Sequence, residues 1–198
     1  MNLRARFDRY RTAWLDLLYP RRCEACDAFL PAHREDTAQW LCDACLKALP
    51  RIEPPFCHVC GEPYDGAITA SFRCGNCADL KLHFDFAISG HRADGAVREL
   101  VHRFKYQRAL HLRGLLGCLL QQAMEDGRIA GETASWVLVP VPLHHARQRE
   151  REYNQAWELC RAVSKRTGLP AFDAMVRARA TTPQASLSRH QRLSLIHI

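Results

Sequence analysis

The sequence predicts a two-part chain, in which a small metal-stabilised N-terminal module precedes an α/β domain. Eight of the ten cysteines form four Cys-x-x-Cys pairs within the first eighty residues. The later residues alternate between helical and strand-like apolar patterns. Hydrophobic residues make up 47% of the chain, as in globular proteins, and no apolar stretch is long enough to span a bilayer.

The chain begins with a helical pattern. Residues 2–19 carry bulky apolar side chains, Trp14 among them, at helical spacing, with arginines on the opposite face, and Pro20 ends the pattern. We therefore expect an amphipathic N-terminal helix over residues 1–20. Such a helix can lie on a membrane, but we expect its apolar stripe to pack against the rest of the protein.

The four cysteine pairs follow in residues 21–80. Fifteen residues separate the first pair from the second, and thirteen separate the third from the fourth. These spacings are close to the ~15–20 residues between the two halves of a four-thiolate zinc ribbon. We therefore predict a double zinc ribbon with two structural zinc sites: Cys23, Cys26, Cys42 and Cys45, then Cys57, Cys60, Cys74 and Cys77. Spacing alone also allows an interleaved scheme, in which the first and third pairs share a metal.

Two other uses of the cysteines fit the sequence less well. Disulfides need an oxidising compartment, and nothing at the N-terminus resembles a secretion signal. Thioredoxin-like redox pairs occur singly beside a βαβ pattern, whereas four pairs follow one another here. A saturated thiolate site leaves no open position for a catalytic water. We therefore expect zinc that stabilises the fold, in a cytoplasmic protein with reduced cysteines.

After residue 80 the pattern is that of an α/β domain. Two segments have the pattern of strands. Residues 84–89 alternate large apolar side chains with polar or small ones, and residues 136–141 form a short apolar run rich in β-branched residues. Three segments keep helical spacing: residues 96–104, 109–124 and 154–167. Gly168 follows the last helix, as expected at a helix end. Gly61, directly after a cysteine pair, is expected at positive φ in a tight turn.

An anion site is expected after the strand at residues 136–141, because ligands of open α/β sheets bind beyond the carboxyl ends of strands. The arginines of residues 147–151 lie there, and the formal charge of +7 favours phosphorylated molecules or nucleic acid as partners. These arginines can equally pair with the intervening glutamates. Asn154 opens the following helix as an anion ligand or as an N-cap. His144 and His145 are expected to be loop residues without a role.

Several motifs resemble one known family. They are the helix before Pro20, the four Cys-x-x-Cys pairs, Phe104-Lys105-Tyr106, Val139-Pro140-Val141-Pro142-Leu143, Arg151-Glu152-Tyr153-Asn154-Gln155-Ala156 and Arg179-Ala180-Thr181-Thr182-Pro183-Gln184. This order is similar to that of the ComF family, competence-associated proteins in which a double zinc ribbon is fused to a type I phosphoribosyltransferase-like domain. The resemblance implies that residues 81–198 form a Rossmann-like domain of this type.

The resemblance also implies a ligand, phosphoribosyl pyrophosphate bound with magnesium. Carried over residue by residue, the substrate-binding candidates are Lys105, Arg151, Asn154, Gln155, Arg179 and Gln184. Their cations and amides would hold phosphates electrostatically. Glu152 stands where the family usually has glycine, and its carboxylate would repel a phosphate unless it turns outward.

The family continues beyond Gln184 with an acidic pair and a Thr-Thr-Gly loop that cradles the 5′-phosphate, whereas residues 193–198 do not resemble that continuation. We therefore expect a domain truncated before this loop, inactive as given and with uncovered apolar surface. The implied function is a phosphoribosyltransferase-type protein linked to DNA uptake or nucleotide salvage. The alternative is a non-enzymatic zinc-ribbon adaptor that binds single-stranded DNA or a protein of the competence machinery.

Overall fold

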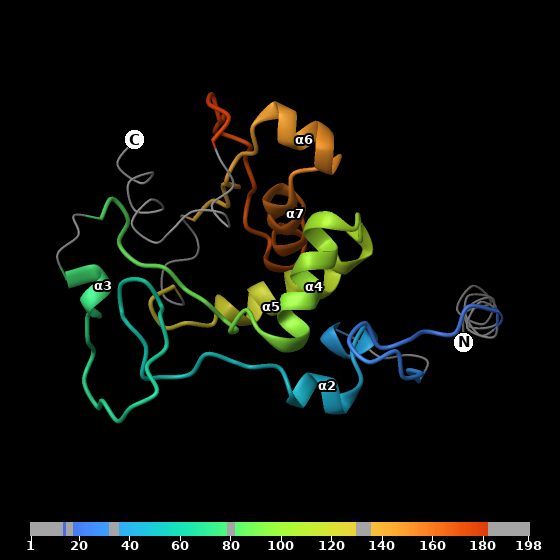
Figure 1. The fold of residues 1–198 in the computed structure, drawn as a ribbon, viewed down its shortest axis with the longest axis horizontal. Coiled ribbons are helices and arrows are strands. Elements are labelled where there is room, and N and C mark those ends of the chain that lie inside the picture. Colours follow the sequence, from blue (N-terminus) through green and yellow to red (C-terminus); the bar gives the residue numbers. More distant parts are fainter. Residues whose placement is uncertain (1–13, 15–17, 32–35, 79–81, 130–135, 182–198) are drawn as a thin grey trace.

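The computed structural model describes residues 14, 18–31, 36–78, 82–129 and 136–181 (Figure 1). The elements in chain order are η1 Asp36–Gln39, α2 Asp43–Lys47, α3 Gly75–Ala78, α4 Gly95–Tyr106, η2 Leu110–Leu112, α5 Arg113–Ala123, α6 His145–Arg151 and α7 Gln155–Thr167. Among the described residues, two cysteine-rich ribbons with one short α-helix each thus precede four longer α-helices. Within the described ranges every β pairing is an isolated bridge.

The three helices predicted after residue 80 are confirmed. Helix α4 buries Val97, Leu100 and Phe104, which share one helical face. Helix α5 continues from η2, and together they cover most of the second predicted segment. Helix α7 begins after Asn154, whose side chain accepts the backbone N–H of Ala156 at 3.0 Å. Because this bond satisfies a free amide of the first turn, Asn154 acts as the N-cap.

The two predicted strands do not form a sheet in the described part of the chain. In the first segment the N–H of Ala87 donates to the carbonyl of Val59 at 2.7 Å, so its backbone pairs with a ribbon. In the second, Leu138 forms a single parallel bridge with Ala171. A strand needs neighbours on which to continue its hydrogen bonds. In the ranges that the structure describes, the helical half of the α/β prediction is therefore seen, and a continuous sheet is not.

Residues His145–Arg151 form helix α6, and His144 is its N-cap, so the prediction of a loop at the two histidines is wrong. The ring nitrogen Nδ1 of His144 accepts the N–H of Ala146 at 3.3 Å and caps the helix. Helix α6 has no buried residue. Its arginines, glutamine and glutamate favour a helix but form no apolar stripe. The periodicity of apolar residues therefore could not predict helix α6.

The main core joins the first ribbon to the helices. Leu41 of the ribbon is fully buried in one cluster with Leu100 of α4 and Leu115 of α5. The second ribbon has a separate, smaller cluster of buried residues: Cys57, Val59 and Cys77. The two ribbons therefore depend on the helices to different degrees.

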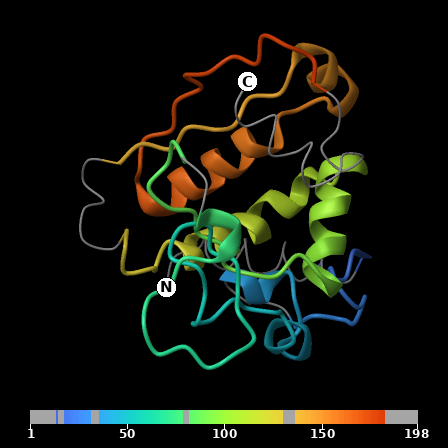
Figure 2. The ribbon, with the colours of Figure 1, turned by 60° about the vertical axis from the view of Figure 1, so that its left-hand side comes forward.

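Helices α5 and α7 lie side by side and run in the same direction (Figure 2). Arg113 bonds to Glu158 near the start of both helices, and Gln121 bonds to Arg166 near their ends. Between these pairs, a Cβ added to Gly117 would lie 2.8 Å from the Cβ of Ala162. Glycine at this position therefore permits the close packing of the two helices.

Most of the predicted N-terminal helix lies outside the described residues. Trp14 and Leu18 are described as helical, and their exposed fractions are 66% and 63%. The predicted packing of the stripe against the protein is thus not seen for these two side chains. Among the described residues, no helix combines the length and the apolar character needed to cross a bilayer.

Candidate metal centres

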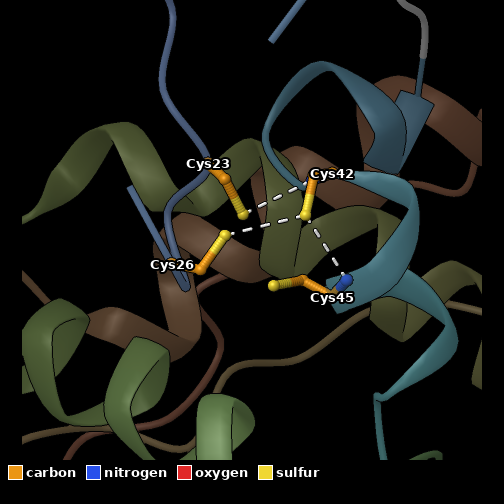
Figure 3. Close-up of side chains that lie close together, drawn as sticks. All are labelled: Cys23, Cys26, Cys42 and Cys45. Atoms are coloured by element: carbon orange, nitrogen blue, oxygen red, sulfur yellow. Dashed lines mark hydrogen bonds between the residues drawn. The ribbon is translucent and has the colours of Figure 1, made fainter. Parts of the chain in front are cut away.

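The first candidate metal centre lies where the turn at residues 23–26 meets the start of α2 (Figure 3). The N–H of Asp27 donates to the carbonyl of Cys23 at 2.8 Å and closes this turn, with Asp27 at a φ of 60°. Cys42 is the N-cap of α2, and Cys45 lies in its first turn. The turn and the helix start thus present two sulfurs each to a shared centre.

The sulfur distances fit a metal site with four thiolates. The four Sγ atoms lie within 4.8 Å of one another, and those of Cys26 and Cys42 are 3.7 Å apart. A tetrahedral zinc with Zn–S bonds of about 2.3 Å separates its sulfurs by about 3.8 Å, whereas a disulfide bond is about 2.05 Å long. None of the ten cysteines forms a disulfide bond in the structure. The geometry therefore matches the metal site and not a disulfide.

The second centre repeats this design. Its sulfurs, those of Cys57, Cys60, Cys74 and Cys77, also lie within 4.8 Å of one another. Gly61 occupies the position that Asp27 has in the first ribbon, and its φ of 71° is the positive value expected for it. The structure thus groups the cysteines in the sequential scheme and not in the interleaved one.

Each quartet contains a cysteine whose pKa is lowered and a cysteine whose pKa is raised. Burial raises the pKa of Cys23, but backbone hydrogen bonds, led by that from Cys42, bring it down to about 6. Cys57 behaves in the same way, with a pKa of about 6. Burial, followed by hydrogen bonds with neighbouring sulfurs, raises the pKa of Cys45 and Cys77. A divalent cation would offset the repulsion among four thiolates, so the donor set suits zinc.

Two arginines tie the ribbons to the helices. Arg103 of α4 donates to the Glu24 carboxylate at 2.7 Å and to the Glu24 carbonyl at 2.8 Å, and Glu24 lies inside the first cysteine turn. Arg128, which follows α5, donates to the carbonyl of His58 in the second turn at 2.7 Å. Sequence reasoning missed both contacts, because nothing in the local pattern links residues this far apart.

Four of the six candidate phosphate-binding residues meet where α4, α6 and α7 adjoin. Arg151 donates to the side-chain oxygen of Gln155 at 3.2 Å, and its guanidinium lies 4.9 Å from the ring centre of Tyr106. The Gln155 amide donates to the carbonyl of Lys105 at 3.5 Å. Asn154, the N-cap, adjoins Gln155 and also donates to the carbonyl of Val141.

The other two candidates are not brought to this cluster. Arg179 is an exposed residue of an irregular segment, and Gln184 lies outside the described residues. Glu152 has a φ of 68°, and its carboxylate pairs with Arg108 at 2.9 Å. The positive φ explains why glycine suits this position, and the ion pair gives the carboxylate a cationic partner.

Comparisons with known proteins agree with the cysteine geometry. The family described as double zinc ribbon domain matches residues 14–78. Competence protein F of Haemophilus influenzae is 31% identical over 155 residues, which cover 77% of this chain and 65% of that protein. DNA utilization protein YhgH is 30% identical over 155 residues in Salmonella typhimurium and 27% identical over 154 residues in Escherichia coli K12. Both alignments cover 77% of this chain and 66% of the relative.

The chain thus spans slightly less than two thirds of the length of these curated relatives. No solved structure matches it. The double zinc ribbon match, the two tetracysteine sites and the identity to competence protein F lead to one assignment. The chain belongs to the ComF family.

Proposed function

We propose that this protein handles DNA during DNA uptake, with two zinc-bound ribbons that hold its helices in place. The observation that carries the proposal is the pair of tetracysteine centres, the first of which shares its core with α4 and α5. The names of the relatives, competence protein F and DNA utilization protein, support a role with DNA. The protein would act in the cytoplasm, where its thiols stay reduced.

In this proposal the zinc ions are structural. The eight cysteines of the two quartets are the ligands, and each site is closed because four protein sulfurs fill a tetrahedral shell. Metal analysis of the purified chain should find two zinc ions, and Cys42→Ser should lose one of them. Cys118→Ser is the matched control, because Cys118 is a buried residue of α5 outside both quartets. Metal-free protein with disulfide-bonded quartets would contradict the proposal.

The role with DNA is tested by direct binding. The zinc-loaded chain should bind a fluorescein-labelled oligo(dT) strand, and the affinity should fall as salt rises because phosphate contacts release counterions. Fluorescence anisotropy at several salt concentrations measures the affinity and its dependence on salt. Absence of binding at low salt would overturn the proposed role with DNA and leave the zinc assignment intact.

A second function, binding of phosphoribosyl pyrophosphate with magnesium, is favoured by the cluster around Arg151. Its guanidinium bonds to neutral groups, Gln155 and Tyr106, and pairs with no carboxylate among the described residues. Such a charge remains available to a phosphate. Lys105, Asn154, Arg179 and Gln184 are the further candidate ligands that we propose on the family resemblance.

Isothermal titration calorimetry with phosphoribosyl pyrophosphate and magnesium tests this second function. Binding should be weakened by Arg151→Gln and kept in Arg149→Gln, which removes an exposed cation from the same helix. A chain extended to the length of its relatives should be tested in parallel, because the aligned part covers only 65% of competence protein F. No heat from either chain would rule out this function.

A further inference from the structure

A basic groove lies along α5 and α7, on the face where Arg113 bonds to Glu158 and Gln121 bonds to Arg166. The groove has a volume of about 960 Å³. Its charged lining residues are Arg113, Glu158, Arg161, Lys165 and Arg166. Four cations therefore face one carboxylate. We call this site the α5–α7 groove.

The single carboxylate of the groove is already shared. Glu158 accepts a hydrogen bond from Arg113 at 3.0 Å and another from Arg161 at 3.2 Å, and its side chain is only 10% exposed. Arg113 and Arg161 keep about half or more of their side-chain surface exposed, 49% and 59%. Lys165 has no acidic partner among the described residues. The groove thus keeps an excess of positive charge facing solvent.

Some of these charges lie where they do not favour the helix that carries them. Arg113 opens α5, where the positive end of the helix dipole disfavours a cation and where no acidic residue is present. Arg161 and Lys165 are four residues apart on α7, where like charges repel each other. The dipole does favour Lys165 and Arg166 in the last turn of α7. Glu158 gives Arg113 and Arg161 a partner, and the dipole favours the cations of the last turn, but one carboxylate does not balance four cations.

We propose that the α5–α7 groove binds the phosphodiester backbone of a nucleic-acid strand. The cations of the groove extend from Arg113, which bonds to Glu158, to Arg166. From Glu158 to Arg166 the rise along α7 is about 12 Å, at 1.5 Å per residue. Cations along such a length suit several phosphates in a row better than one small anion. The lining contains no aromatic residue on which a base could stack. The contacts would therefore be made to the backbone and would not depend on base sequence.

This inference rests on the proposed role with DNA and assigns it a surface separate from the zinc ribbons. The test uses the zinc-loaded full chain and a fluorescein-labelled oligo(dT). The double variant Arg161→Glu with Lys165→Glu should bind about tenfold more weakly or worse at low salt. Replacing two phosphate contacts should also lower the slope of log affinity against log salt by about 1.4, or 0.7 per contact for a single strand.

The matched control reverses the same number of charges elsewhere. Lys47 of α2 and Arg98 of α4 are exposed and do not line the groove. Lys47→Glu with Arg98→Glu should keep the salt slope of the wild type. Lys165→Gln alone serves as a second groove variant, since it leaves the pairs of Glu158 intact, and it should lower the slope by about 0.7.

The outcomes separate the two proposals. If the wild type binds the strand and the groove variants bind like the control, the groove assignment is wrong and the role with DNA stands. If the wild type does not bind at all, the role with DNA fails and the groove assignment fails with it. Equal losses in the groove variants and in the control would show a response to net charge only, which also overturns the groove assignment.

Discussion

Replacing Arg103 with methionine tests how the first ribbon is held to the helices. The substitution keeps an apolar stem of similar length and removes the guanidinium that donates to the carboxylate and to the carbonyl of Glu24. The Glu24 carboxylate is left with His111, whose Nε2 lies 3.3 Å away. The expected result is local loosening of the first cysteine turn.

The burial of the pair sets the expected magnitude. Exposed ion pairs contribute about 0–1 kcal/mol, whereas hydrogen bonds to charged groups contribute about 1.5–3 kcal/mol. The side chains of Arg103 and Glu24 are 25% and 20% exposed, so the upper range is the closer guide. We expect the first ribbon to lose about 2 kcal/mol of stability, equivalent to roughly thirtyfold faster amide exchange where local opening limits exchange.

Hydrogen exchange measured by mass spectrometry on the zinc-loaded chain reads each ribbon separately. In Arg103→Met, peptides from residues 21–30 should exchange faster, and peptides from residues 56–64 should not change. Arg128→Met provides the matched variant, because Arg128 holds the second turn through the carbonyl of His58. In Arg128→Met, peptides from residues 56–64 should exchange faster, and peptides from residues 21–30 should not change. If either variant changes both ribbons equally, or neither ribbon, the assignment of one arginine to each ribbon is refuted.

Three further predictions concern single positions. Gly61→Ala should destabilise the second ribbon by about 1–2 kcal/mol, since alanine is strained at a φ of 71° and its Cβ would lie 3.0 Å from the carbonyl oxygen of Ala87. Glu152→Gly should raise the melting temperature, because relief of the positive φ is worth about 1 kcal/mol and the exposed ion pair lost is worth less. Burial, and then the charge of Arg51, lower the pKa of His91, so the fold should lose stability as pH falls from about 6.5 toward that lower pKa, and His91→Gln should reduce this loss.

Each of these predictions has a contrary outcome. A Cβ at Gly75 would meet no atom within 4 Å, so Gly75→Ala should be neutral in the melting experiment, and equal effects at Gly61 and Gly75 would contradict the strain argument. Glu150→Gly places glycine inside α6 and should cost about 1 kcal/mol, opposite in sign to the change at Glu152. Denaturant unfolding at saturating zinc measures the free energy of unfolding at each pH. This free energy should fall less steeply with falling pH in His91→Gln than in the wild type, and parallel curves would contradict the role of burial.

The correct sequence predictions came from local patterns. The cysteines that the structure groups are those whose spacing along the chain favoured grouping, and the positive φ of Gly61 followed from its place after a cysteine pair. Helices α4 and α7 were predicted because buried residues such as Leu100 recur on one face. Helix α6 was missed because it buries no side chain, and periodicity detects burial more than it detects helix.

The strands were predicted less well for a different reason. Residues 136–141 have strand-like composition, but whether they join a sheet depends on a partner from another segment. Leu138 finds such a partner only at Ala171 among the described residues. The alternation of residue types says nothing about the availability of a partner, so a sheet is less certain from sequence than a helix that forms its own hydrogen bonds.

By itself, the sequence determined which side chains can form each metal centre, because the two halves of a quartet lie close enough along the chain for spacing to limit their pairing. Tertiary structure alone decided that the first ribbon, and not the second, shares the main core, and that the cations of α5 and α7 gather in one groove. These features depend on contacts such as Glu24 with Arg103 and Arg113 with Glu158, which are 79 and 45 residues apart. No periodic pattern of apolar residues encodes which distant polar partners will meet, since that outcome depends on how the helices pack.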